Sequence, residues 1–148
     1  MQENLMWTLK QLHLTLEQYG RTTMKDLDLS PTQSVVLHYL LAQKGQVEYA
    51  VDLHEILGIS KSSVSSALKS LKQKGYPTTA GDPVDDRKKR IALTQKAMDM
   101  EKTIEASLLE QQKRLCREIS PQRLERLQDD LMIMLGNIRN ESRLEEQL

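Results

Sequence analysis

Apolar residues recur at spacings of three and four in three long segments of the chain, and this spacing is typical of amphipathic helices. We expect the first of these long helices to end near Gly20 and the second to begin at Thr94. Ser120 and Pro121 are favourable at a helix start and predict that the last helix begins there, with a frayed polar tail after Asn140. The three apolar stripes comprise Leu5, Leu9, Leu12, Leu16 and Tyr19; Ala97, Ile104, Leu108 and Leu115; and Leu124, Leu127, Leu131, Met134, Leu135 and Ile138.

Three shorter helices are predicted between the first and second stripes. The first starts at Ser30, which can form a capping box with Gln33, has Pro31 at its first helical position and ends at Gly45. The second lies within "VEYAVDLHEILGIS" and stops at Gly58, and the third runs from Ser60 to Gly75. The apolar positions expected to face the core are Val35, Val36, Tyr39 and Leu40 in the first helix, Val51, Leu53, Ile56 and Leu57 in the second, and Val64, Ala67, Leu68 and Leu71 in the third.

A β-hairpin is predicted directly after these helices. The segments "YPTTA" and "RIALT" are short and rich in residues that favour strands, and a turn containing Gly81, Asp82 and Pro83 separates them. Because Pro77 has no N–H to donate to a neighbouring strand, we expect its strand to lie at the edge of the sheet.

Composition narrows the fold class and the compartment. The 148 residues are 39% hydrophobic but only 3% aromatic, with no Phe, so aliphatic side chains must build the core of a mainly α domain. No apolar run approaches the length of a membrane span, and the N-terminal residues do not resemble a signal peptide. A single cysteine, Cys116, excludes an internal disulfide and favours a cytoplasmic protein.

Charge is distributed unevenly along a chain whose formal net charge is zero. Eight basic and three acidic residues lie between Lys61 and Arg90, whereas the segments on both sides are net acidic. This arrangement indicates a local anionic partner.

Short helix, glycine-containing turn, second helix and basic hairpin together predict a winged helix-turn-helix. The second helix of the motif has small hydroxyl side chains and lysines opposite its apolar stripe, and these suit the major groove and its phosphates. The hairpin tip has four consecutive basic residues, and Asp85 could orient Arg87. The candidate DNA contacts are Lys61, Ser62, Ser65, Ser66, Lys69 and Lys72 on the helix and Arg87, Lys88, Lys89 and Arg90 on the hairpin.

The part of the sequence from Leu29 to Thr94 resembles the MarR family of bacterial transcriptional regulators. The resemblance rests on "LSPTQSVVLHYL", "DLHEILGISKSSVSSALKSLKQKGY" and "DPVDDRKKRIALT", where Asp85, Arg87 and Leu93-Thr94 match the wing pattern. It implies a mainly α homodimer in which residues 1–28 and 95–148 form the dimer and residues 29–94 bind double-stranded DNA. A small-molecule effector that releases a repressor from a palindromic operator is implied in the same way.

Three positions depart from the pattern of the family. The strand after Tyr76 has Pro77-Thr78-Thr79 where a basic residue is frequent, Asp86 replaces a basic or small residue, and Ala97 replaces a Gly. Because the first two departures weaken the case for DNA, a second hypothesis stays open. In it, the basic face of a winged-helix interaction module binds an acidic protein partner.

The dimer is also expected from the apolar stripes, since they exceed what a small central domain can cover. The residues assigned to it are Leu5, Leu9, Leu12, Leu16, Leu108, Leu115, Leu124, Leu127, Leu131 and Leu135. The three histidines have no metal-ligand spacing, Cys116 is more simply a helix thiol than a redox sensor, and no catalytic constellation is present. We therefore expect no enzyme, no metal and no cofactor.

Overall fold

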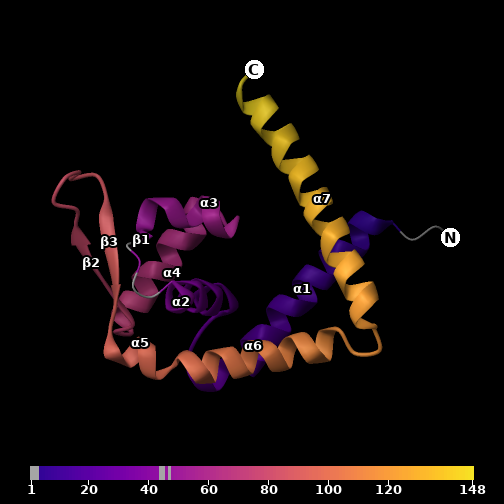
Figure 1. Cartoon of the computed structure of the whole chain (residues 1–148), viewed down its shortest axis with the longest axis horizontal. Coiled ribbons are helices and arrows are strands. Elements are labelled where there is room, and N and C mark those ends of the chain that lie inside the picture. The colour runs from indigo at the N-terminus through magenta and orange to yellow at the C-terminus, as the bar shows by residue number, and fades with distance from the viewer. Residues whose placement is uncertain (1–3, 44–45, 47) are drawn as a thin grey trace. The chain divides into compact units, whose positions relative to one another are not determined.

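A computed structural model describes residues 4–43, 46 and 48–148, and these residues form a mainly helical fold with one small antiparallel sheet (Figure 1). The chain divides into two compact units, one ending at Leu109 and one starting at Glu110. The helices are α1 (Leu5–Thr23), α2 (Pro31–Ala42), α3 (Leu53–Leu57), α4 (Lys61–Gln73), α5 (Gln95–Asp99), α6 (Glu101–Leu115) and α7 (Pro121–Glu146), with 3-10 turns η1 (Lys25–Leu27) and η2 (Ala50–Asp52); the strands are β1 (Glu48–Tyr49), β2 (Pro77–Gly81) and β3 (Lys89–Leu93).

Four helices begin at the side-chain caps that the sequence predicts or allows. The Ser30 hydroxyl accepts from the Gln33 N–H at 3.1 Å, and the Gln33 side chain accepts from the Ser30 N–H at 3.2 Å, which is a complete capping box. Ser60 and Ser120 likewise cap α4 and α7, and Thr94 caps α5. Local sequence therefore determines where these helices start.

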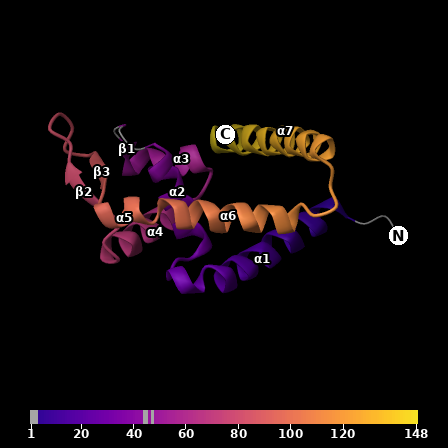
Figure 2. The ribbon, with the colours of Figure 1, turned by 60° about the horizontal axis from the view of Figure 1, so that its bottom comes forward.

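The sheet has the order β1-β3-β2, with both pairs antiparallel. The predicted hairpin is confirmed, with Thr79 opposite Ile91, and Pro77 lies in an edge strand as expected. Strand β1 was not predicted, because two residues are too few to show an alternating pattern. In Figures 1 and 2 the hairpin lies beside β1, and its β2 strand contacts α4 while its tip projects away from the helices.

The core of the first unit lies between α2, α4, the sheet and the start of α6. The stripe predicted for α4 is buried, and Leu53 and Ile104 are fully enclosed. Three predicted core positions are wrong: Val35, Val51 and Ile56 are 42%, 52% and 50% exposed. Val51 lies in η2 rather than in a regular helix, and α3 has only five residues, so a helical period assigned over the whole segment misplaces its apolar side chains.

Several helix boundaries also differ from expectation. Helix α1 continues beyond Gly20 to Thr23, and the helix expected from Thr94 is divided at Met100 into α5 and α6. The predicted fraying after Asn140 is wrong, because α7 continues to Glu146 through residues with good helix propensity. Gly45, the predicted end of α2, lies outside the described residues, and α2 itself ends at Ala42.

The terminal helices carry large apolar side chains that are not covered. On α1, Leu5 and Leu12 are exposed, and on α7, which belongs to the second unit, Leu127, Leu135 and Ile138 are exposed. Among the helices in the described part of the chain, none is long and apolar enough to cross a membrane.

Candidate nucleic-acid interface

Helix α4 is held against α2 by packing on one face and by a polar network near its C-terminal end. The Gln33 amide, besides closing the α2 capping box, donates to the Ser70 hydroxyl at 3.1 Å and accepts from Lys74 Nζ at 2.9 Å. Lys74 Nζ also donates to the Asp28 carbonyl. Because Val64 and Leu71 are buried at the same time, the polar face of α4 is fixed toward solvent.

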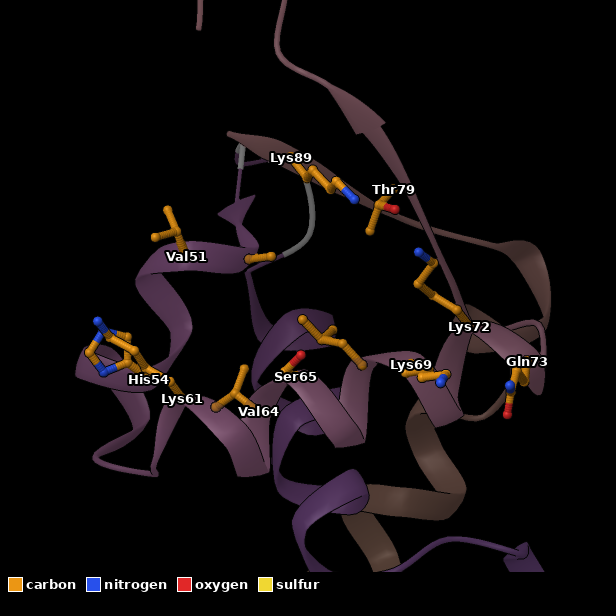
Figure 3. Close-up of a pocket in the computed structure, with 12 residues that line it drawn as sticks. Val51, His54, Lys61, Val64, Ser65, Lys69, Lys72, Gln73, Thr79 and Lys89 are labelled. Atoms are coloured by element: carbon orange, nitrogen blue, oxygen red, sulfur yellow. The ribbon is translucent and has the colours of Figure 1, made fainter. Parts of the chain in front are cut away.

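A groove of about 500 Å³ lies between α4, the segment η2–α3 and the hairpin, and we call it the α4 groove. Figure 3 shows Val64 and Ser65 at its floor, Lys69 and Lys72 along α4, and Thr79 and Lys89 of the hairpin on the opposite side. Four lysines, and no Asp or Glu, are among the described residues that line the α4 groove, so the charge of its lining favours an anion. Its residues are Ala50, Val51, His54, Lys61, Val64, Ser65, Leu68, Lys69, Lys72, Gln73, Thr79 and Lys89.

The structure divides the predicted helix contacts between two surfaces. Lys61, Ser65, Lys69 and Lys72 line the α4 groove together with Lys89 of the hairpin. Ser62 and Ser66 are exposed on the adjacent face of α4, where they line a shallower hollow with the N-terminal turn of α2. All helix members of the predicted set are therefore exposed, on two adjacent faces of α4.

The hairpin tip is organised by Asp82, which the sequence did not single out. Its Oδ1 accepts from the N–H groups of Val84 at 2.8 Å and Asp85 at 3.1 Å. Its Oδ2 accepts from Tyr49 Oη at 2.8 Å and from Arg90 Nε at 2.9 Å. A nearly buried carboxylate thus has partners on the turn, on β1 and on β3.

Asp85 contacts the backbone of Arg87 and not its side chain, which differs from the predicted orientation of the guanidinium. Asp85 Oδ1 accepts from the backbone N–H of Arg87 at 3.0 Å, which shapes the turn without holding the guanidinium. Among the described residues, the ion pair of the hairpin is Asp82–Arg90. The Arg87 side chain projects from an exposed turn, whereas Lys88 Nζ lies 5.0 Å from the centre of the Tyr49 ring.

Hydrogen bonding explains the acid–base behaviour of this turn. Donation from the Val84 N–H, followed by donation from Arg90 and Tyr49, holds the pKa of Asp82 well below its usual range. The same hydrogen bond to Asp82 raises the pKa of Arg90. Both groups are therefore charged wherever the protein is folded near neutral pH.

Sequence reasoning missed the residues that η2 and α3 contribute to the α4 groove. Val51 was assigned to the helix core, His54 to the surface or to packing, and Ala50 to no role, and the two-residue strand that precedes them gives no periodic signal. Tyr49 was missed for the same reason, since it reaches the hairpin only through the β1–β3 pairing, and Asp82 was predicted as a turn residue without its hydrogen-bonding role. No group of residues that could hold a metal ion occurs in the described ranges.

Residues 27–88, which contain α2, α3, α4 and most of the hairpin, match the sequence model of the MarR family. This segment of the chain is therefore similar to the MarR family. No curated protein matches the chain in sequence. The MarR-family match covers the turn around Asp82 and the residues of the α4 groove other than Lys89, and it leaves β3 and the terminal helices outside.

Solved structures of MarR-family proteins have the same fold. The chain is similar to MepR of S. aureus in its complex with DNA, at 20% identity and a TM-score of 0.84, covering 92% of this chain and 99% of the other. It is similar to a MarR protein from Peptoclostridium difficile, at 18% identity and a TM-score of 0.85, covering 95% and 91%. A putative MarR-family regulator from Listeria monocytogenes, complexed with a 26mer DNA, gives 18% identity, a TM-score of 0.82 and coverage of 94% and 91%.

Proposed function

We propose that this protein is a homodimeric transcriptional repressor that binds a palindromic DNA operator and is released from it by a small ligand. The observation that carries the proposal is the α4 groove, in which Lys61, Lys69, Lys72 and Lys89 lie around the accessible Ser65 of α4, and the described residues that line it include no Asp or Glu. The solved complexes of two structural relatives with DNA support the same assignment.

In this proposal α4 enters the major groove of the operator. Ser65 and Ser66 are small enough to let the helix approach base edges, where a hydroxyl can donate or accept a hydrogen bond. The lysines of the α4 groove neutralise phosphates on both sides. The exposed Arg87 extends the contact along the backbone or into the adjacent minor groove, where cationic side chains are favoured.

The exposed apolar side chains of the terminal helices support the dimer in this proposal. Residues 29–94 then bind DNA, and residues 1–28 and 95–148 form the subunit interface. A C2 dimer presents two copies of α4, and operators of such dimers have half-sites about one helical turn apart. The small ligand is proposed on the resemblance to the family, and a ligand that lowers operator affinity in a solution screen would identify it.

The test is selection of bound duplexes from a random pool, followed by titration of the selected duplex against salt. The proposal expects a palindromic consensus and an affinity that falls steeply with salt, because each neutralised phosphate releases counterions. A reporter driven by a promoter carrying that consensus should be transcribed more strongly when the gene for this chain is deleted.

A different outcome would favour the second hypothesis, in which the basic face binds an acidic protein. Selection would then give no consensus, and affinity would not depend on duplex length. The DNA-binding proposal would be abandoned in that case.

A further inference from the structure

Asp82 is an acidic residue almost completely buried in the most basic turn of the chain. Only 7% of its surface is exposed, and a buried carboxylate is costly unless it is fully hydrogen-bonded. Both oxygens are satisfied, Oδ1 by two backbone N–H groups of the turn and Oδ2 by Tyr49 and Arg90. Asp82 is therefore a structural centre of the hairpin tip and not an isolated acidic residue.

Arg90 differs from its basic neighbours because its charge is already compensated. Its Nε donates to Asp82 at 2.9 Å, and a charge-assisted hydrogen bond of this length is among the stronger polar contacts in proteins. A phosphate that pulled the Arg90 side chain away from the hairpin would break this bond and leave the Asp82 carboxylate without its ion-pair partner. The pair contributes no net charge to the surface that faces a nucleic acid.

Tyr49 connects this pair to the rest of the sheet. It lies directly opposite Arg90 in the β1–β3 register, its hydroxyl donates to Asp82 at 2.8 Å, and its ring lies beneath Lys88. A cation over an aromatic face is stabilised by the ring quadrupole. One side chain therefore fixes the turn through its hydroxyl and places a lysine through its ring.

We propose that Tyr49, Asp82 and Arg90 form a positioning lock, in which Arg90 is an internal counter-ion and not a DNA contact. The lock holds the hairpin tip against β1 so that Arg87, Lys88 and Lys89 are presented to the phosphates of the operator. This inference rests on the proposed DNA-binding function and assigns different roles to four adjacent basic residues. It replaces the sequence-based expectation that Arg90 contacts DNA.

Salt titration separates a counter-ion from a residue that binds phosphate. Arg87→Gln should lower the slope of log affinity against log salt by about 0.9 for each phosphate that the variant no longer neutralises. Arg90→Gln should weaken binding roughly fivefold through a loosened hairpin, while the slope stays at the parent value. If Arg90→Gln lowers the slope as Arg87→Gln does, Arg90 touches phosphate and the proposal is overturned.

A second pair of variants tests the lock without changing any charge. Tyr49→Phe keeps the ring beneath Lys88 and removes only the hydroxyl, whereas Tyr39→Phe removes a hydroxyl that lies 3.5 Å from Glu48. Tyr49→Phe should accelerate amide hydrogen exchange at Val84 and Asp85 and weaken operator binding roughly fivefold with an unchanged salt slope. Tyr39→Phe should do neither, and equal effects of the two variants would contradict the lock.

The exchange measurement also separates the two proposals. If the parent binds no duplex, the proposed function fails, while faster exchange at Val84 and Asp85 in Tyr49→Phe and in Arg90→Gln would still support the lock. If exchange in both variants equals that of the parent, the lock fails, whatever the DNA result.

Discussion

Ser65 lies at the floor of the α4 groove between lysines, and the proposed function makes it a candidate base contact. We expect Ser65→Ala to cost roughly 1–3 kcal/mol of operator binding and to relax preference at one position of each half-site. Ser142→Ala, on the exposed C-terminal part of α7, is the matched control and should leave binding unchanged. Competition among single-base operator variants measures the effect, and an unchanged preference profile would place Ser65 away from the bases.

The contribution of Asp82 to the stability of the fold should depend on pH, and the hydrogen bonds that Asp82 accepts determine the direction of this dependence. Its pKa is lower in the folded chain than in the unfolded one, so it stabilises the fold above the usual aspartate range, near 3.9, and loses that contribution as pH falls below it. Asp82→Asn should therefore be less stable than the parent at neutral pH, with a difference that shrinks in acid.

Chemical denaturation at several pH values measures this difference in the free energy of unfolding. Asp86→Asn is the control, because Asp86 is exposed in the same turn and its replacement should change stability little at any pH. A deficit of Asp82→Asn that stays constant down to strongly acidic pH would contradict the assignment.

At the scale of elements, replacement of glycine by alanine is expected to change the stability of the fold in opposite directions at two positions. Gly75 follows α4 with a φ of +83°, a conformation that costs an alanine about 1 kcal/mol or more. Gly136 lies within α7, and a Cβ added there meets nothing within 4 Å. We expect Gly75→Ala to destabilise the fold by about 1 kcal/mol and Gly136→Ala to stabilise it by roughly 0.5–1 kcal/mol.

Thermal unfolding of the two alanine variants side by side tests this contrast. Destabilisation by Gly136→Ala would show that another backbone approaches α7 at this point. Stabilisation by Gly75→Ala would mean that the end of α4 can adopt a different conformation.

At the scale of the whole molecule, the proposed dimer predicts that a charge on the apolar stripe of α7 separates the subunits. Leu131→Asp should raise the dimer dissociation constant about 100-fold, because an uncompensated buried charge costs roughly 3 kcal/mol or more. Operator affinity should fall with it, since the two copies of α4 then bind independently. Light scattering and duplex binding measure the two effects.

Asn137→Asp adds the same charge at an exposed position of α7 outside the predicted stripe and serves as the control. It should leave both the dimer and DNA binding intact. A parent protein that is monomeric at micromolar concentration would contradict the dimer itself.

Much of the fold could be predicted because its signals are local. The capping box at Ser30, the buried stripe of α4 and the hairpin from Pro77 to Leu93 were all predicted from residues within a few positions of one another. Errors arose where the local period is short or interrupted, as in the five-residue α3 and at the division between α5 and α6. A helical period needs several turns to distinguish the buried face from the exposed one.

The sequence by itself determined the mainly α class, the resemblance to the MarR family and the accumulation of basic residues between Lys61 and Arg90. These properties follow from composition, periodicity and motif spacing, which exist before the chain folds. Only the tertiary structure decided which of the basic residues in the hairpin has an acidic partner. Asp82 lies eight residues from Arg90, and the antiparallel pairing of β2 with β3 brings them together; Tyr49 lies thirty-three residues from Asp82, and it reaches Asp82 through the pairing of β1 with β3. Charge neutralisation inside the hairpin therefore depends on distances between strands, which the order of residues along the chain does not contain.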